Sequence, residues 1–126
     1  MDNNIKECIN AALSIDGTVG AAIGDWSTGF SLGQGSLDAS SLSNQKLEQA
    51  IALNSEVIKA KKRTRRELGI SSPIEDILIT LQNQYHLIRL CDRIEGVFFY
   101  LVMNRDKANL GLARIKLRQI EKNLHI

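Results

Sequence analysis

Three apolar runs joined by short polar segments occupy residues 74–103, IEDILITLQNQYHLIRLCDRIEGVFFYLVM. The runs are Ile74–Leu81, Tyr85–Cys91 and Val97–Met103, and Pro73 precedes the first of them. Short runs of this kind, rich in Ile, Leu, Val and aromatic residues, are typical of β-strands. Because a parallel crossover needs about a dozen residues or more, connections this short make the strands antiparallel neighbours. The segment therefore predicts three hairpin-connected strands.

Two further strands are predicted nearer the N-terminus. Thr18–Asp25 has the composition of a buried strand, the turn Trp26–Gly29 ends it, and Phe30–Leu32 forms the next strand. Gly33–Ser43 is rich in Gly and Ser and is expected to be a loop. The first of these strands has small residues that leave room for the close approach of a helix backbone; they are Gly20, Ala21, Ala22 and Gly24.

The two ends of the chain are predicted to be helical. Apolar residues at i, i+3, i+4 and i+7 indicate an amphipathic helix from about Asp2 to Leu13, with Asp2 or Asn3 as its N-cap. The same kind of spacing predicts a helix from Asp106 to about Leu124.

A long helix is predicted in the middle of the chain. Ser41 or Ser43 is its N-cap, the helix runs to Leu68, and Gly69 suits its C′ position. Its apolar residues form two lines, one with Leu47, Ile51 and Ile58, the other with Ala50, Leu53, Val57 and Ala60. The C-terminal helix also has two lines, one with Leu110, Ala113, Leu117, Ile120 and Leu124, the other with Ala108, Leu112 and Ile115. Since one core needs only one apolar stripe, these helices suggest self-association.

The predicted order of elements is α-β-β-α-β-β-β-α. It corresponds to the α/β (α+β) class, with a five-stranded, antiparallel-rich sheet flanked by helices. A chain of 126 residues with 44% hydrophobic and 24% charged residues can bury a core without disulfides or metal, so we expect a single domain over residues 1–126.

Composition also bears on where the protein resides. The N-terminal residues lack the basic and apolar regions of a signal peptide, and no apolar run approaches the ~18 residues of a membrane span. Cys8 and Cys91 lie far apart and in no CxxC spacing, so both are expected to be buried thiols and not metal ligands or a redox pair. These observations predict a cytoplasmic protein.

One motif points to catalysis. Gly29–Gly33, GFSLG, matches the G-x-S-x-G nucleophile elbow of serine hydrolases, with Ser31 as the nucleophile. The elbow needs a strand, a sharp turn and a helix in immediate succession, whereas here the motif opens a strand and the helix starts some ten residues later. A base would have to come from His86 or His125. We therefore expect no enzyme activity.

Cofactor and metal sites are not predicted either. Gly33 and Gly35 are spaced as in phosphate-binding loops, but Asp38 stands where the third glycine of G-x-G-x-x-G is required, and no P-loop motif is present. His86 is expected in a strand at the sheet surface and His125 at a frayed terminus, without the partners of a metal or acid–base site.

The basicity of the chain is concentrated in one place. The net charge is +2, and six cations lie between residues 59 and 66, which leaves 2 − 6 = −4 for the remainder. The six are Lys59, Lys61, Lys62, Arg63, Arg65 and Arg66. Cations are favoured at the C-terminal end of a helix by its dipole, and the same residues suit an acidic protein surface or nucleic acid. No aromatic residues interleave with them, as single-stranded nucleic acid would favour.

Both ends of the chain resemble one known family. Residues 15–25, IDGTVGAAIGD, resemble the opening "I-x-G-V-x-G-A-x-x-x-D" hairpin of the roadblock family, which is dynein light-chain-like and has bacterial and archaeal members. Residues 101–114, LVMNRDKANLGLAR, resemble its last strand and the "A-N-L-x-L-A-R" helix that follows. With the element order, the likeness spans nearly the whole chain and implies a roadblock or profilin-like fold; the basic end of the long helix departs from the family pattern.

The resemblance implies a non-catalytic protein that forms homo- or heterodimers and serves as a regulator or scaffold of small Ras-like GTPases or related signalling proteins. We expect a homodimer without cofactors. The competing interpretations are binding of nucleic acid or an acidic partner through residues 59–66, and a small serine hydrolase using Ser31. The predicted dimer or partner interface combines the second line of the long helix with the edge of the Ile74–Leu81 strand; its residues are Leu53, Val57, Ala60, Ile77 and Ile79.

Overall fold

A computed structural model of the chain describes residues 2–126. Over this part of the chain the elements follow the predicted order. Their bounds are α1 Ile5–Leu13, β1 Thr18–Asp25, β2 Phe30–Ser36, α2 Asn44–Glu67, β3 Asp76–Thr80, β4 Gln84–Leu90, β5 Val97–Asn104 and α3 Leu110–Asn123.

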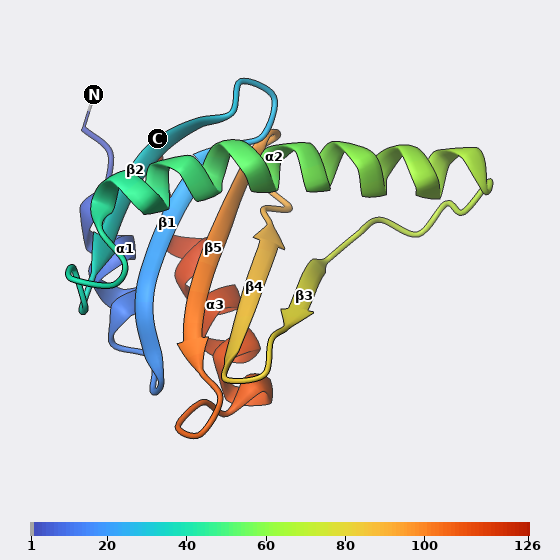
Figure 1. Cartoon of the computed structure of the whole chain (residues 1–126). Helices are drawn as coiled ribbons and strands as arrows, with labels where there is room; N and C mark the ends of the chain where they lie inside the picture. The colour runs from blue at the N-terminus through green and yellow to red at the C-terminus, as the bar shows by residue number, and fades with distance from the viewer. Residues whose placement is uncertain (1) are drawn as a thin grey trace.

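The strands form one sheet in the order β2-β1-β5-β4-β3, and every neighbouring pair is antiparallel. Helix α2 lies on one face of the sheet, while α1 and α3 lie on the other (Figure 1). The predicted fold class and the hairpin connections of the last three strands are therefore confirmed. The two edge strands are β2 and β3.

Strand β5 is the centre of the molecule because both of its faces are covered. Phe98, Tyr100 and Val102 belong to the core beneath α2, and the alternate residues Phe99, Leu101 and Met103 belong to the core beneath α1 and α3. All six side chains are at most 4% exposed. Because both faces of β5 are buried, its sequence Val97–Met103 is continuously apolar and does not alternate apolar with polar residues.

The close approach predicted for the small residues of β1 is confirmed at two glycines. A Cβ at Gly24 would lie 2.5 Å from Cγ2 of Ile51 in α2, and a Cβ at Gly20 would collide with the side chain of Leu42. Ile51 is fully buried and cannot move aside. Glycine at these positions lets α2 and the segment before it rest directly on the strand.

The prediction for the start of the first helix is wrong by three residues. Helix α1 begins at Ile5, and Asn4 is its N-cap position without a side-chain capping bond. Asn3, one of the two predicted caps, accepts a hydrogen bond from the Ile5 N–H at 3.1 Å. The side-chain amide of Asn4 instead donates to the backbone carbonyl of Asn123. The backbone N–H of Asn4 donates to the backbone carbonyl of His125. The contact with the C-terminus thus holds these residues outside the helix.

The loop predicted for residues 33–43 is wrong in its first part. Strand β2 continues to Ser36, and Gly33, Gln34, Gly35 and Ser36 pair with β1. A Cβ at Gly33 would lie 2.6 Å from Cγ2 of Ile5. The glycines that suggested a loop are required because α1 lies against this strand.

The C-terminal helix also starts later than predicted. Helix α3 begins at Leu110, and the Asn109 side chain caps it by accepting from the Leu112 N–H at 3.0 Å. Lys107 and Ala108 donate their backbone N–H groups to the carbonyl of Asn104, which makes this segment a turn. The strand predicted at 74–81 is likewise shorter, Asp76–Thr80.

Helix α2 starts and ends where the sequence predicts, but it is longer than the sheet it covers. The Ser43 side chain accepts from the Lys46 N–H at 3.1 Å, and Gly69 has φ +70° at the other end. The last buried side chain of α2 is Ile58. Beyond it the helix projects past strand β3, and residues 69–75 return beside it to the sheet (Figure 1). We call residues 59–67 the projecting end.

The contact between Gly24 and α2 can be tested by adding one methyl group. Gly24→Ala is expected to lower the free energy of unfolding by about 1–3 kcal/mol, because the new Cβ overlaps the immobile Ile51. Gly111→Ala is the control, since the nearest atom to a Cβ added at this helical glycine would lie 3.7 Å away. It should be stabilising by about 0.5–1 kcal/mol through helix propensity. Chemical denaturation of the three proteins measures both effects, and equal stability of Gly24→Ala and the wild type would contradict the packing described.

Candidate partner interface

The two apolar lines of α2 differ in how deeply their side chains are buried. Leu47, Ile51 and Ile58 are fully buried against the sheet. In the second line Ala50 and Val57 are half-buried, Ala60 is exposed and Leu53 is 65% exposed. The protein's own core is thus built mainly on the first line, and Ala50 of the second line packs against it. We call Leu53, Val57 and Ala60 the outer line.

The wide apolar arc predicted for the C-terminal helix is also present. Ala113, Leu117 and Leu124 are buried, whereas Leu112 is 38% and Ile115 is 51% exposed. Both helices thus present apolar side chains that the core does not need, but they do so on opposite faces of the sheet (Figure 1).

The two sheet edges differ in regularity. Strand β3 pairs with β4 over five consecutive residues without a bulge, and no other described strand pairs with its outer side. Strand β2 has a register irregularity opposite Ile23 and Gly24. Bulges and covering helices are the devices that protect an edge from pairing, so β3 is the edge better suited to accept a further strand. Ile77 and Ile79 of β3 are half-buried and pack on the same face as α2.

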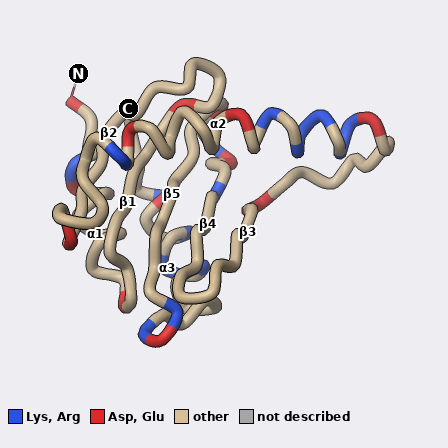
Figure 2. Tube along the Cα trace, in the orientation of Figure 1, with Lys and Arg blue, Asp and Glu red and all other residues tan. Residues whose placement is uncertain are grey.

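The six predicted cations all lie on the projecting end (Figure 2), and the structure gives them different surroundings. Lys62 Nζ lies 5.0 Å from the centre of the Trp26 ring, a cation–π contact. Arg65 donates to the carbonyls of Ile70, Ser71 and Ser72 at 3.1–3.3 Å and so fastens the returning segment to the helix. These two cations have structural roles.

The remaining cations face solvent. Arg63 pairs with Glu67 at 3.3 Å, but both side chains are well exposed, and such pairs contribute little. Only Arg65 and Arg66 lie in the last turn of α2. Because the dipole effect falls off within one turn, it does not account for Lys59, Lys61, Lys62 or Arg63.

Ser31 has no catalytic surroundings. Its hydroxyl bonds to the Gln34 side chain at 2.5 Å and lies 3.3 Å from the Gly33 carbonyl. Ser31 is in edge strand β2, and β1 and β5 separate it from His86 in β4. His125 is exposed, but the predicted frayed terminus is wrong, because the His125 N–H donates to Oδ1 of Asn4 at 2.8 Å and its carbonyl accepts from the Asn4 N–H at 3.3 Å. The motif therefore brings no base to Ser31, and the nucleophile-elbow geometry is not formed.

His86 forms a polar cluster under α2. Its Nδ1 lies 2.9 Å from the Tyr100 hydroxyl and its Nε2 lies 3.0 Å from Oε1 of Gln84. Burial lowers the pKa of His86 and raises the pKa of Tyr100 to about 12, with a hydrogen bond from Asn54 acting in the opposite direction on the tyrosine. His86 lies in a strand, as predicted, but it is half-buried and not at the open surface.

Two features were missed by sequence reasoning. The first is an ion pair between Arg89 and Glu121 at 2.7 Å, with both side chains 5% exposed, which joins β4 to α3. Two signals were available in the sequence. Arg89 is a charged residue within the apolar run Tyr85–Cys91, and Glu121 is spaced with the apolar residues Leu117 and Leu124. The second is Phe30 at the start of β2, which is 72% exposed.

Thiols, metal ligands and membrane helices can be assessed over residues 2–126. Cys8 is buried and Cys91 half-buried, both as free thiols, and burial raises the pKa of Cys91 to about 12. No cluster of His, Cys, Asp and Glu in these residues is arranged to hold a metal ion. None of the described helices is both long and apolar enough to cross a membrane.

The buried histidine gives a prediction for acid sensitivity. Because the pKa of His86 is below its ordinary value of 6.5 in the folded protein, the unfolded chain binds its proton first as pH falls. The contribution of His86 to stability is thus complete above 6.5 and is lost as pH falls towards the folded-state pKa. His86→Gln should show a smaller loss of unfolding free energy than the wild type between about pH 7.5 and about pH 5.5 in denaturant titrations. Equal losses in the two proteins would contradict this assignment.

Comparison with known proteins identifies the fold. No protein-family model matches the sequence, and no curated protein matches it either. Solved structures do match over nearly the whole chain. A roadblock/LC7 domain from Streptomyces avermitilis is 12% identical, with a TM-score of 0.72 over 94% of this chain and 88% of that one. MglB from Myxococcus xanthus is 10% identical, with a TM-score of 0.72 over 93% and 85%.

A further MglB structure, described as having a tetrameric arrangement, is 17% identical, with a TM-score of 0.69 over 94% of this chain and 88% of that one. At these identities the matches establish architecture, and they agree with the element order and sheet topology described above. The chain has the roadblock/LC7 fold.

Proposed function

We propose that this protein is a non-catalytic, dimeric interaction module. The observation that carries the proposal is that a regular, unpaired sheet edge and a projecting helix with unused apolar residues lie on the same side of the molecule (Figure 1). A second copy placed there would satisfy both features at once. The proposed contact consists of Leu53, Val57 and Ala60 of α2 and Ile77 and Ile79 of β3.

Edge pairing explains why α2 is longer than the sheet. If two β3 strands pair across a two-fold axis, the sheet of one copy continues into the sheet of the other. The projecting end, which has no buried side chain over its own sheet, then lies over the partner's sheet. The same axis makes the contact isologous, so each copy covers the other in the same way.

Charge along α2 supports an antiparallel arrangement of the two helices. The first part of the helix has a net charge of −1, from Lys46, Glu48 and Glu56, and the projecting end has six cations and Glu67. In an antiparallel pair each basic end approaches the other copy's acidic part, whereas a parallel pair would bring the two basic ends together. The tetrameric arrangement described for one MglB structure is an example of self-association on this fold.

The partner class follows from the resemblance noted in the sequence. Roadblock proteins serve small Ras-like GTPases, and we propose a GTPase or related signalling protein as the partner of this dimer. The surfaces described here are apolar and charged, and Ser31 lacks a base, which favours binding over catalysis. The free thiols Cys8 and Cys91 fit a reducing, cytoplasmic environment.

Self-association can be tested with one charged substitution and a matched control. Leu53→Glu is expected to give a folded monomer, because Leu53 is 65% exposed in the single chain but central to the proposed contact. Leu37→Glu introduces the same charge at a residue 64% exposed outside this contact and should leave the dimer intact. A contact of standard size buries roughly 800 Å² per partner, so sedimentation at micromolar concentration should resolve dimer from monomer. A monomeric wild type would refute the proposal.

A further inference from the structure

A directional hydrogen-bond network connects α2 to the sheet through β5 and β4. Nε2 of His86 lies 3.0 Å from Oε1 of Gln84, an oxygen that can only accept, so Nε2 carries the proton. Nδ1 of the neutral ring is then an acceptor, and the Tyr100 hydroxyl donates to it at 2.9 Å. Asn54 of α2 lowers the pKa of Tyr100 by hydrogen bonding, which makes its side chain a donor to the phenolic oxygen. We call these four residues the polar network.

The polar network is matched only while His86 is neutral. A protonated imidazole donates from both nitrogens, so the Tyr100 hydroxyl would have to accept from His86 and from Asn54 at once. Its own proton would then lose the acceptor that it has now. Because Tyr100 is only 4% exposed, water has little access to replace that acceptor. Protonation of His86 therefore disturbs the contact between Asn54 and the sheet.

The surroundings of His86 within its own chain are uncharged. Its neighbours across the strands are Ile79 of β3 and Val102 of β5. Within residues 2–126 the titratable side chain in direct contact with the ring is that of Tyr100. The charged side chains of β3, of β4 and of the residue after β5 make their contacts on the other face of the sheet; they are Asp76, Arg89 and Arg105. Any charge that faces His86 would therefore have to come from outside the single chain.

The polar network reaches the surface on the side of α2 that carries the second apolar line. Asn54 follows Ala50 by four residues and precedes Val57 by three, so these side chains share one side of the helix. Asn54 and His86 are half-buried, as Ala50 and Val57 are. Ile79, which pairs with His86 across the strands, belongs to the proposed dimer contact. The polar network thus borders the surface assigned to the second copy.

A second copy would bring positive charge towards His86. In the proposed antiparallel pair, the projecting end of one copy crosses β3 and then β4 of the other, and β4 holds His86. Lys61 is exposed and follows Asn54 by seven residues, which places it on the contact side of the projecting end. In its own chain it is about 10 Å further along the helix axis than Asn54. Lys61 is therefore the cation that each copy carries towards the other copy's His86.

We propose that the polar network makes self-association sensitive to pH, so that the dimer forms with neutral His86 and weakens when His86 is protonated. The inference rests on the proposed dimer. Two effects act in the same direction: the second copy removes further water from the ring, and its cationic end opposes a positive charge there. The monomer consequently binds the proton more readily than the dimer does. Linkage then requires that acid shifts the equilibrium towards monomer.

Sedimentation equilibrium at about pH 7.5 and about pH 5.5 tests the proposal. The wild-type Kd of the dimer is expected to rise about tenfold at the lower pH, because each dimer contains two copies of His86. His86→Gln keeps a polar side chain that does not titrate, and its Kd should change less than about twofold. His125→Gln is the control, since His125 bonds to Asn4 away from the proposed contact, and it should keep the wild-type rise. Equal rises in the wild type and His86→Gln would overturn the proposal.

The proton affinity of the ring can be measured directly by NMR. The chain has two histidines, and His125→Gln assigns their imidazole signals. The pKa of His86 should be lower in the wild-type dimer than in the monomers Leu53→Glu and Leu53→Lys. These variants place opposite charges at one position, so a higher pKa in both comes from loss of the second copy and not from the new charge. An equal pKa of His86 in the dimer and in both monomers would overturn the proposal.

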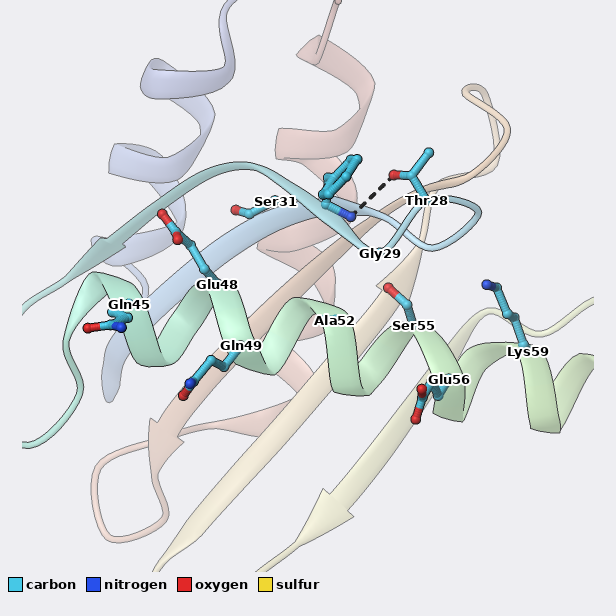
Figure 3. Close-up of a pocket in the computed structure, with 11 residues that line it drawn as sticks. Thr28, Gly29, Ser31, Gln45, Glu48, Gln49, Ala52, Ser55, Glu56 and Lys59 are labelled. Atoms are coloured by element: carbon cyan, nitrogen blue, oxygen red, sulfur yellow. Dashed lines mark hydrogen bonds between the residues drawn. The ribbon is translucent and has the colours of Figure 1, made fainter.

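The approach of a cation is tested with two lysines on opposite sides of α2. Lys61→Gln should reduce the rise in Kd to about threefold, the effect of losing one exposed charge contact per copy. Lys59→Gln removes the same charge from the side of α2 that faces Thr28 and Gly29 across a groove (Figure 3). It should keep the wild-type rise. Equal rises in the two variants would overturn the assignment of Lys61.

Failure of the dimer can be separated from failure of this inference. A wild-type protein that is monomeric at about pH 7.5 would refute the proposed function, and the inference with it. A wild-type dimer whose Kd is the same at both pH values would refute the inference alone. Circular dichroism at both pH values establishes that the chain is folded where the Kd is measured.

Discussion

The close contact between β1 and α2 fixes how the helix presents each of its surfaces. Gly24 has no side chain, so Ile51 can rest directly on the strand, and Leu47 and Ile58 extend the same contact along the helix. A helix held at several points along one line has little freedom to rotate or slide. The outer line and the projecting end are consequently presented in fixed directions, each determined by its angle from the buried line.

Helix length is the second constraint. The 24 residues of α2 exceed what its sheet covers, and its buried side chains end at Ile58. Six like charges on the remaining residues repel one another within the helix, and only the exposed Arg63–Glu67 pair offsets them. Arg65 holds this end to the returning segment by hydrogen bonds, and Lys62 holds it to Trp26 by a cation–π contact. The positive charge at this end is therefore offset only in part within the single chain, which is consistent with the interface proposed above.

The two side chains considered for catalysis are hydrogen-bonded within the chain. The serine of the G-x-S-x-G motif is hydrogen-bonded within its own strand, and the half-buried histidine is bonded to a tyrosine and a glutamine. Accessible features of the described chain include the edge strand β3 and the outer line of α2. The edge strand and the outer line are the surfaces on which the proposed dimer rests.

Local patterns were enough to predict the order of the elements, the antiparallel hairpins and the second apolar line of α2, and they narrowed the cap of α2 to Ser41 or Ser43. Apolar periodicity, turn residues and caps act over a few neighbouring positions. They failed where a distant segment decides the local structure. Gly33 and Gly35 suggested a loop but are strand residues that accommodate α1, and Asn4 leaves its helix to bond with the C-terminus. The Arg89–Glu121 pair joins residues that are far apart along the chain. Only the packing of helices on the sheet brings them together, since their proximity depends on long-range burial that no local pattern encodes.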